Sequence, residues 1–249
     1  MGYIYGVNPV IEAINSGKTI NKIYIQKGNK ELGKVLEIAR TNRIVTVFAD
    51  RNKLDRMITE EGEKLRNSQG IVASVTDFEY CEVDEILALA KSKNEEPLVV
   101  ILDKIEDPHN LGAILRTIEC LGFHGCIIQK RNACQVNDTV EKVAAGACSY
   151  VKVSRVTNIT ETIKYLKKQG LWIYGLDMEG AEEIYNAKLS GALGIVIGNE
   201  GDGISRLVKE NCDGMIKIPM TGNINSLNAS VSGAISMYEI IRQKNKGEK

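Results

Sequence analysis

From residue 97 onward, short apolar segments typical of β-strands alternate with segments whose apolar residues recur at helical spacing. This alternation predicts a parallel sheet with helices on both faces, and the unbroken apolar run 98–102 is typical of a strand covered on both sides. The predicted strands are 98–102, 126–128, 151–153, 172–174, 194–197 and 215–218. Because ligands bind beyond the carboxyl ends of such strands, we expect the functional site in the loops that follow them.

The first 76 residues predict a smaller, separate α/β domain. Strands are expected at 23–25, 44–48 and 71–75, with a helical pattern over 32–39. The polar, acidic segment that follows contains one short helical pattern and ends at a proline, so we interpret it as a linker. The expected boundaries are 1–76 for the smaller domain, 77–96 for the linker and 97–249 for the larger domain.

The formal net charge is zero, because lysine plus arginine and aspartate plus glutamate each number 32. A protein that binds nucleic acid through its overall charge is normally basic, so any nucleic-acid binding by this chain would require a local basic patch. The candidate patch is 18–43, which could equally be an ordinary solvated surface. Its charged residues are Lys18, Lys22, Lys27, Lys30, Lys34, Arg40 and Arg43 against Glu31 and Glu37.

The six cysteines and two histidines do not form a metal-binding pattern, since no CxxC pair occurs and His109 and His124 complete no zinc spacing. We therefore expect no metal. The sequence shows no basic stretch followed by a long apolar run at its start, and no apolar stretch of membrane-spanning length. These features favour a reduced, soluble, cytoplasmic protein with no membrane partner.

The loop after strand 98–102 leads into a helix with an apolar side. An ordinary strand–turn–helix connection explains Pro108 as the turn and Asn110 as the helix cap. It does not explain Arg116, which lies off the apolar side. Gly112 is four residues before Arg116, so we expect its missing side chain to leave room for a ligand beside the guanidinium.

Three glycines follow strand 194–197 within six residues, in the order Gly198, Gly201 and Gly203. Such glycines indicate a tight turn or a close approach of the backbone to a ligand. Their order is not the GxGxxG dinucleotide fingerprint, and no Lys-Ser/Thr pair follows, which excludes a nucleotide-dependent oxidoreductase and a P-loop NTPase. Glu200 would repel a phosphate but suits a cationic ligand or a hydroxyl that must lose a proton.

Polar side chains are concentrated in the loop after strand 215–218. Ser226 could simply cap the last helix, but the tract has more hydrogen-bonding groups than a cap requires, namely Asn223, Asn225, Ser226 and Asn228. The helix that follows is predicted to be amphipathic. Its apolar side consists of Leu227, Val231, Ala234, Ile235, Tyr238 and Ile241.

Together the three loops resemble, in order and spacing, the signature motifs of the TrmH/SpoU branch of the SPOUT methyltransferases. The first motif is Asp-Pro-His-Asn-Leu-Gly-Ala-Ile-Leu-Arg at 107–116, and the second is Ile-Gly-Asn-Glu-Gly-Asp-Gly-Ile at 197–204. The third combines Ile-Pro-Met at 218–220 with Ser-Leu-Asn-Ala-Ser at 226–230. Three motifs in one chain make the resemblance specific.

The resemblance extends outside the motifs to the RlmB-like subgroup of 23S rRNA (guanosine-2′-O-)-methyltransferases. Residues 5–10 and 69–73 are similar to the N-terminal substrate-binding domain of that subgroup, so nearly the whole chain is covered. Ser68 replaces a common His and Ile118 a usual Ala. The resemblance implies an N-terminal domain like ribosomal proteins L7Ae and L30e. It also implies a catalytic domain with a trefoil knot, and a homodimer that joins through the C-terminal domain and shares active-site residues.

What the resemblance implies chemically is S-adenosylmethionine-dependent methylation of a ribose 2′-hydroxyl in RNA. Arg116 is implied as the catalytic residue and is proposed in the family as a general base. Arginine stays protonated in proteins, so either the site favours a neutral guanidine or Arg116 binds the target phosphate and stabilises the developing alkoxide; we favour the second, with Glu200 as the fallback base.

The remaining site residues carried over from the resemblance have two roles. Arg116, the ribose and the cofactor are expected to be oriented by Asn110, Glu200, Ser226 and Asn228. The expected cofactor-binding residues are Gly175, Leu176, Gly198, Asn199, Gly203, Ile218, Met220 and Leu227.

Two other functions remain open. One is methylation of a different target, either a tRNA ribose or another rRNA site. The other is a non-catalytic RNA-binding factor in ribosome assembly that retains a vestigial pocket, against which the intact motif residues argue. No cysteine lies in the motifs, which weighs against methylation of a base through a thiolate adduct.

Overall fold

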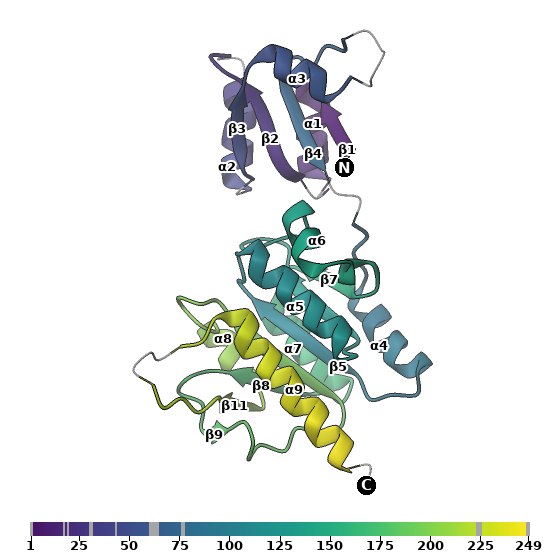
Figure 1. Cartoon of the computed structure of the whole chain (residues 1–249), viewed down its shortest axis with the longest axis vertical. Coiled ribbons are helices and arrows are strands. Elements are labelled where there is room, and N and C mark those ends of the chain that lie inside the picture. The colour runs from purple at the N-terminus through teal and green to yellow at the C-terminus, as the bar shows by residue number, and fades with distance from the viewer. Residues whose placement is uncertain are drawn as a thin grey trace. The chain divides into compact units, whose positions relative to one another are not determined.

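The computed structural model describes residues 2–16, 18, 20–29, 32–42, 44–59, 65–75, 78–222 and 226–247. The chain divides into two compact units, one made chiefly of Met1–Glu79 and the other of Tyr80–Gln135 and Thr139–Lys249. Each unit has its own sheet (Figure 1). Each also has its own hydrophobic core. Of the residues singled out in the sequence, Lys30, Glu31, Arg43, Asn223 and Asn225 lie outside the described residues.

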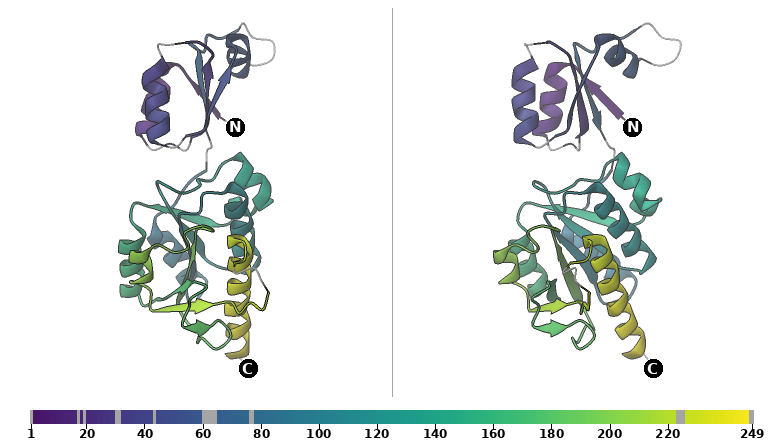
Figure 2. Two further views of the ribbon diagram at one scale, coloured as in Figure 1. Left: turned by 90° about the vertical axis from the view of Figure 1, so that its left-hand side faces the viewer. Right: turned by 60° about the vertical axis from the view of Figure 1, so that its left-hand side comes forward.

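The first unit is a four-stranded sheet in the order β1-β4-β2-β3. Its elements are β1 (Gly2–Tyr5), α1 (Val7–Asn15), β2 (Ile20–Gln26), α2 (Gly33–Thr41), β3 (Thr46–Ala49), α3 (Arg51–Met57) and β4 (Ile71–Val75). Strand β4 is antiparallel to both neighbours, whereas β3 is parallel to β2. Figure 2 shows α1 and α2 on one face of the sheet and α3 on the other.

Strand β4 is buried on both faces, which explains why four of its five residues are apolar. Ile71 and Ala73 pack in the core beneath α1 and α2, and Val72 packs with Leu54 of α3 on the opposite face. The three strands predicted for this unit are present. The sequence analysis missed β1, which is short and half-exposed and therefore gives little apolar signal.

The second unit contains a seven-stranded parallel sheet in the order β7-β6-β5-β10-β8-β11-β9. Its strands are β5 (Leu98–Asp103), β6 (Gly125–Gln129), β7 (Lys152–Val156), β8 (Trp172–Leu176), β9 (Glu182–Glu183), β10 (Leu193–Gly198) and β11 (Gly214–Lys217). Every strand predicted here is present, and the prediction of a parallel sheet is confirmed. Only the short edge strand β9 was not predicted.

Helices cover both faces of this sheet. They are α4 (Val83–Ser92), α5 (Pro108–Cys120), α6 (Asp138–Ala144), α7 (Ile159–Lys168), α8 (Arg206–Lys209) and α9 (Ala229–Gly247), with a 3₁₀ turn, η2, at Ala147–Ser149. Helices α4, α7 and α8 pack into one core with the strands. On the other face α9 comes so close to β10 that a Cβ added at Gly233 would lie 2.7 Å from Cδ1 of Ile197.

The strand order changes direction at the pair β5/β10. The chain moves from β5 through β6 to β7 on one side, and β10 and β8 lie on the other. Doubly wound sheets bind ligands at the carboxyl ends of the strands beside such a switch point. The sheet therefore directs attention to the residues that follow β5 and β10.

The segment interpreted as a linker, 77–96, belongs largely to the second unit. Helix α4 lies within it, and Ile86 of that helix is fully buried in the second core. The backbone N–H of Cys81 donates to the carbonyl of Val153 at 3.0 Å. The acidic composition thus reflects the exposed side of a packed helix, where Asp84 and Glu85 lie, and not an extended connection.

Helix α9 buries one side and leaves three large apolar residues exposed. Its buried residues are Ala229, Gly233, Ser236, Met237 and Ile240. Val231, Ile235 and Tyr238 are 46%, 39% and 62% exposed, although the sequence places them on the apolar side of the helix. We call these three residues the α9 stripe. Its exposure means that the apolar side of α9 is not covered by the sheet of its own chain.

Candidate functional site

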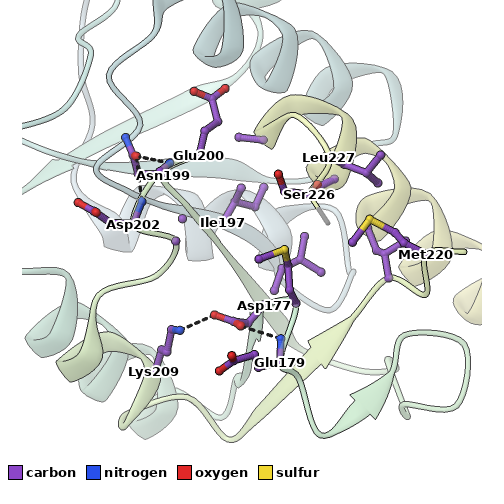
Figure 3. Close-up of a pocket in the computed structure, with 18 residues that line it drawn as sticks. Asp177, Glu179, Ile197, Asn199, Glu200, Asp202, Lys209, Met220, Ser226 and Leu227 are labelled. Atoms are coloured by element: carbon purple, nitrogen blue, oxygen red, sulfur yellow. Dashed lines mark hydrogen bonds and ion pairs between the residues drawn. The ribbon is translucent and has the colours of Figure 1, made fainter. Parts of the chain in front are cut away.

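A cavity of about 320 Å³ lies at the carboxyl ends of β8, β10 and β11, where the loops of the sequence motifs meet (Figure 3). Most of the residues predicted for the site line it: Leu176, Gly198, Asn199, Glu200, Gly203, Ile218, Met220, Ser226 and Leu227. The cavity is thus formed by segments that lie between Leu176 and Ser232 in the sequence and come together at neighbouring strands of the sheet. Arg116 and Gly175 are not among its lining residues.

The glycines of the loop after β10 allow its backbone to fold back on itself. A Cβ added at Gly198 would lie 2.2 Å from the carbonyl carbon of Gly203, so no other residue fits without displacing the backbone. Asn199 and Gly203 exchange two backbone hydrogen bonds, of 3.1 and 2.8 Å, and Gly203 has a φ of +65°. Of the two explanations offered by the sequence, the tight turn accounts for both of these glycines.

The side chain of Asn199 ties this loop to the loop after β5. Its Oδ1 accepts from the N–H of Gly201 at 2.8 Å, and its Nδ2 donates to the carbonyl of Lys104 at 3.0 Å. Both polar atoms are therefore engaged by the protein. The side chain of Asn199 thus shapes the cavity, and only the backbone of this residue is available to contact a ligand.

Asp103, which the sequence analysis did not single out, anchors the far end of the same loop. This carboxylate is fully buried, and its Oδ2 accepts from the N–H of Ser205 at 2.7 Å and from its hydroxyl at 2.6 Å. Its Oδ1 accepts from Gln129 at 3.4 Å. An aspartate at the end of an apolar strand, directly at the switch point, was the available signal.

Glu200 is held from two helix N-termini. Its Oε1 accepts hydrogen bonds from Nδ2 of Asn110, in the first turn of α5, and from Nδ2 of Asn228, at the start of α9, the latter at 3.1 Å. Within the described part of the chain, Oε2 has no hydrogen-bond partner. Figure 3 shows the carboxylate above the loop that carries Asn199. One oxygen fixes the side chain, and the other is free to accept a proton or a hydrogen bond.

The helix caps differ from the sequence predictions. Asp107, not Asn110, caps α5, because its side chain accepts from the N–H of His109 at 3.0 Å. Asn228, not Ser226, caps α9 by accepting from the N–H of Ser230 at 3.0 Å. Because Asp107 caps α5, the Asn110 amide is free to donate to Glu200. Asn228 does both: its Oδ1 caps α9 and its Nδ2 donates to Glu200.

Arg116 lies on α5, exposed and outside the cavity lining. It is six residues beyond Asn110, which is roughly 9 Å along the helix axis. Among the described residues it has no hydrogen-bond or ion-pair partner. Gly112 does not leave room for a ligand beside it, contrary to our expectation, since an added Cβ would lie 2.7 Å from Cβ of Val143 in α6. Gly112 is required by helix packing.

The wall formed by the end of β8 and by the segments between β11 and α9 is apolar. It presents Leu176, Ile218, Met220 and Leu227 to the cavity. Gly175 lies one residue behind this wall, because an added Cβ would lie 2.6 Å from Sδ and Cε of Met215. Its contribution is to let Met215 pack against the strand, not to contact a ligand.

The opposite wall of the cavity carries charged side chains that were not predicted from the sequence. Asp177, directly after β8, pairs with Lys209 at 2.5 Å and accepts from the N–H of Glu179 at 2.9 Å. Partial burial would raise the pKa of Asp177, but the hydrogen bonds from Lys209 and Glu179 outweigh it and hold the pKa below its ordinary value. Glu179, Glu200 and Asp202 add further carboxylates to the lining, so the cavity is acidic overall.

No group of three or more His, Cys, Asp or Glu side chains that could hold a metal ion occurs in the described ranges. None of the helices described is both long enough and apolar enough to cross a membrane.

Comparison with protein families matches both units. Residues 97–238 match the SpoU rRNA Methylase family, and residues 3–81 match the family of RNA 2′-O ribose methyltransferase substrate-binding domains. The first match includes every residue of the cavity described above.

Bacterial relatives match over nearly the full length. YacO of Bacillus subtilis, whose name places it among the TrmH family tRNA/rRNA methyltransferases, is 41% identical over 245 residues, which is 98% of this chain and 96% of the relative. A protein of Staphylococcus saprophyticus named for the same family is 43% identical over 244 residues, covering 97% and 96% of the two chains.

Solved structures share the fold. The SpoU methyltransferase AviRb from Streptomyces viridochromogenes, in complex with the cofactor AdoMet, superposes with a TM-score of 0.63 at 24% identity, covering 98% of this chain and 91% of AviRb. A TrmH/SpoU tRNA modifying enzyme from A. aeolicus gives a TM-score of 0.57 at 26% identity, covering 66% of this chain and 85% of that one.

Proposed function

Because the chain belongs to the SpoU rRNA Methylase family and is an RNA methyltransferase of the TrmH/SpoU type, we propose that it methylates a ribose 2′-hydroxyl of RNA with S-adenosylmethionine as the donor. The observation that carries this proposal is the position of Glu200. Its carboxylate is fixed through one oxygen beside a ligand-sized cavity, and the other oxygen is free to receive a hydroxyl proton.

The cavity fits the donor in size and chemistry. Its volume of about 320 Å³ lies within the range of small-molecule sites, roughly 300–1,000 Å³. The apolar wall of Leu176, Ile218 and Leu227 suits an adenine ring, and the carboxylate of Glu179 suits ribose hydroxyls. An acidic cavity also favours a positively charged sulfonium. Bound there, the cofactor supplies an activated methyl group, and the protein supplies alignment and proton removal.

Glu200 is the residue to which we assign proton removal. Its two amide contacts hold the side chain in one rotamer, so a substrate hydroxyl that reaches Oε2 is correctly oriented without further ordering of the enzyme. A carboxylate accepts the hydroxyl proton as the ribose oxygen attacks. Ser226, which also lines the cavity, is placed to hydrogen-bond the ribose or the donor.

Arg116 is assigned to the phosphate of the target nucleotide and not to proton removal. The exposed guanidinium has no protein partner in the described residues, and a permanently charged fork suits a phosphate and a developing alkoxide. Its place outside the cavity lining agrees with a role toward RNA and not toward the donor.

For the target we propose a guanosine of 23S rRNA, supported by an N-terminal unit that matches ribose methyltransferase substrate-binding domains. A tRNA ribose is the second candidate, since the names of the relatives include both RNAs. The knotted chain path, the L7Ae-like first unit and the cytoplasmic location expected from the sequence belong to the same proposal.

A homodimer is also part of the proposal, supported by the α9 stripe. Val231, Ile235 and Tyr238 recur at helical spacing and remain exposed on the last helix. A row of large apolar side chains on one exposed helix face is typical of an interface. Leu227, 38% exposed, continues the row to the edge of the cavity.

The test is methyl transfer in vitro from S-adenosylmethionine with a deuterated methyl group. The acceptors are unmodified 23S rRNA and a tRNA pool, and the products are nucleosides resolved by mass spectrometry. We expect the label on the ribose of a guanosine from 23S rRNA. Label on tRNA ribose would move the target to the second candidate, whereas label on a base, or no label on any RNA, would contradict the proposed function.

A further inference from the structure

Three basic residues occupy the carboxyl edge of the sheet on the side of β5 that faces away from the cavity. Asp103 and Gln129 end the neighbouring parallel strands β5 and β6, and Lys104 and Lys130 directly follow them. Arg131 comes next. Gly198 ends β10 and leads to Glu200. Because adjacent strands are about 4.8 Å apart, Lys104 follows a strand one spacing away from β10, and Lys130 and Arg131 follow a strand two spacings away.

The backbone of Lys104 is held in an unusual conformation from both sides. Its φ is +59°, in the left-handed region that non-glycine residues rarely adopt. Its N–H donates to Oε1 of Gln129 at 3.1 Å, and its carbonyl accepts from Asn199 at 3.0 Å. The loop that shapes the cavity thus fixes the starting direction of the Lys104 side chain.

The loop after β6 is tied to the same framework. The N–H of Cys134 donates to the carbonyl of Ile105 at 2.7 Å, and Nε2 of Gln135 donates to the carbonyl of Gln129 at 2.9 Å. Lys130 itself donates its N–H to Val156 of β7 at 2.9 Å. The backbone that carries Lys104, Lys130 and Arg131 is therefore one hydrogen-bonded surface and not a set of independent loops.

The charges on this surface are unpaired. Lys130 and Arg131 are exposed and Lys104 partly so, and none of the three side chains has a hydrogen-bond or ion-pair partner in the described part of the chain. Of the nearby carboxylates, Asp107 accepts from the N–H of His109 at the start of α5. Glu106 is engaged within the protein. In a chain of zero net charge, such a local concentration of free cations requires a reason.

We propose that Lys104, Lys130 and Arg131 bind consecutive phosphates of the RNA strand and lead it to the methyl-transfer cavity; this rests on the proposed function. We call the three residues the basic rim. A polyanion is repelled by the acidic cavity but attracted by the rim beside it, so the two together place the RNA backbone on one side of Glu200 and the donor on the other.

The experiment measures RNA binding as a function of salt. The probe is a fluorescein-labelled single-stranded oligouridylate, and its anisotropy gives the observed association constant at several KCl concentrations. We expect Lys130→Gln/Arg131→Gln to weaken binding roughly tenfold and to reduce the slope of log K against log [KCl] by about 1.4, since each lost contact to a single strand contributes about 0.7. Lys104→Asn removes the third charge with a residue that tolerates the left-handed region.

The matched control is Lys168→Gln/Lys188→Gln, which removes two exposed lysines that precede β8 and β10 and so lie toward the amino edge of the sheet. The control should bind RNA like the wild type, and every variant should bind S-adenosylmethionine with unchanged affinity by calorimetry. The inference is wrong if the rim variants match the control, or if the wild type shows no salt-dependent binding of the oligouridylate. A wild-type protein that binds no S-adenosylmethionine would instead contradict the proposed function.

Discussion

Beyond β8 and β10 the carboxyl edge of the sheet carries mainly carboxylates. Beyond β5 and β6 it carries the three cations of the basic rim, beside Glu106 and Asp107, which are engaged within the protein. On the acidic side, the one lysine that lines the cavity, Lys209, is paired with Asp177. On the basic side, the cations of the rim are unpaired in the described part of the chain. The two sides meet at Asp103, whose buried carboxylate holds the cavity loop through Ser205.

This difference shows how a neutral chain can handle two ligands of opposite charge. Uniform positive charge would attract RNA but repel a sulfonium, and uniform negative charge would do the reverse. Because the charges are separated along one edge, the sulfonium donor binds in the cavity, which we call the acidic half, and the RNA backbone binds at the basic rim, which we call the basic half. Substitutions that alter one half should therefore leave the other ligand's affinity intact.

Glu200→Gln should have the largest effect on the acidic half. Glutamine retains an oxygen that can accept from Asn110 and Asn228, but it cannot accept a proton from the ribose. We expect the turnover number to fall about 1,000-fold while the affinity for S-adenosylmethionine changes less than about threefold. Single-turnover methyl transfer and calorimetry measure the two quantities. Turnover within tenfold of the wild type would remove Glu200 as the proton acceptor.

Arg116→Ala tests the boundary between the halves. Loss of the guanidinium should slow methyl transfer a few hundred-fold, which is typical for one charged group that stabilises a developing oxyanion. Donor affinity should not change, because Arg116 does not line the cavity. Lys91→Ala on α4 is the control, an exposed cation on the other face of the sheet. Wild-type turnover on RNA would show that Arg116 has no role.

Ile235→Lys asks whether each acidic half works within a dimer. A symmetric interface brings both copies of the substitution together, and we expect dimer dissociation to become about 30-fold easier. Sedimentation velocity across a concentration series measures it. Leu207→Lys is the matched control, because Leu207 is 56% exposed on α8. If both variants sediment like the wild type, the α9 stripe is not the interface.

Asp103→Ala removes the carboxylate that connects the end of β5 to the cavity loop through Ser205. The N–H and hydroxyl of Ser205 would lose their acceptor in a buried place, which costs about 2–3 kcal/mol of unfolding free energy. Donor affinity should fall about tenfold as the cavity loop loosens. Ser205→Ala removes only the hydroxyl donor and should cost less than half as much. Equal losses in denaturant titrations of the two variants would contradict the tether.

His124 gives the smallest effect and lies away from both halves. Burial lowers its pKa, although Glu95 opposes this, and its Nδ1 accepts from the N–H of Leu98 at 3.0 Å. The folded state therefore disfavours the protonated ring. The free energy of unfolding should have its full value above about pH 6.5, the unfolded pKa, and should decrease as the pH falls below it. His124→Gln should flatten this step in denaturant titrations; a variant with an unchanged step would exclude His124 as its source.

The sequence predicted the sheet of the second unit well, because apolar runs and parallel topology are linked directly. It predicted the cavity residues through the motifs, but it misassigned the groups that organise them. The sequence suggested that Asn110 caps a helix, but its side chain donates a hydrogen bond to Glu200. It suggested that Gly112 leaves room for a substrate, but this glycine lets α5 pack closely against α6. Such roles depend on partners distant in the chain, which one sequence pattern does not contain.

Asp177, Lys209 and the basic rim were missed for a related reason. Asp177, Lys104, Lys130 and Arg131 are charged residues just after strands, and Lys209 is one at the end of a short helix; such charges are common on any protein surface. Only the register of the sheet brings Lys104 beside Lys130 and both beside the loop of Glu200. The arrangement of these charged residues can be recognised only once it is known which strands are neighbours in the sheet.

The separation of the two ligands is tested most directly by measuring both affinities in one pair of variants. Met220→Trp should fill the cavity from its partly exposed edge, and Lys130→Gln/Arg131→Gln discharges the rim. We predict that the first variant loses S-adenosylmethionine binding and keeps RNA binding, and that the second does the reverse. If the rim variant lost the donor, or if both variants lost the same ligand, the division of the edge into two sites would be wrong.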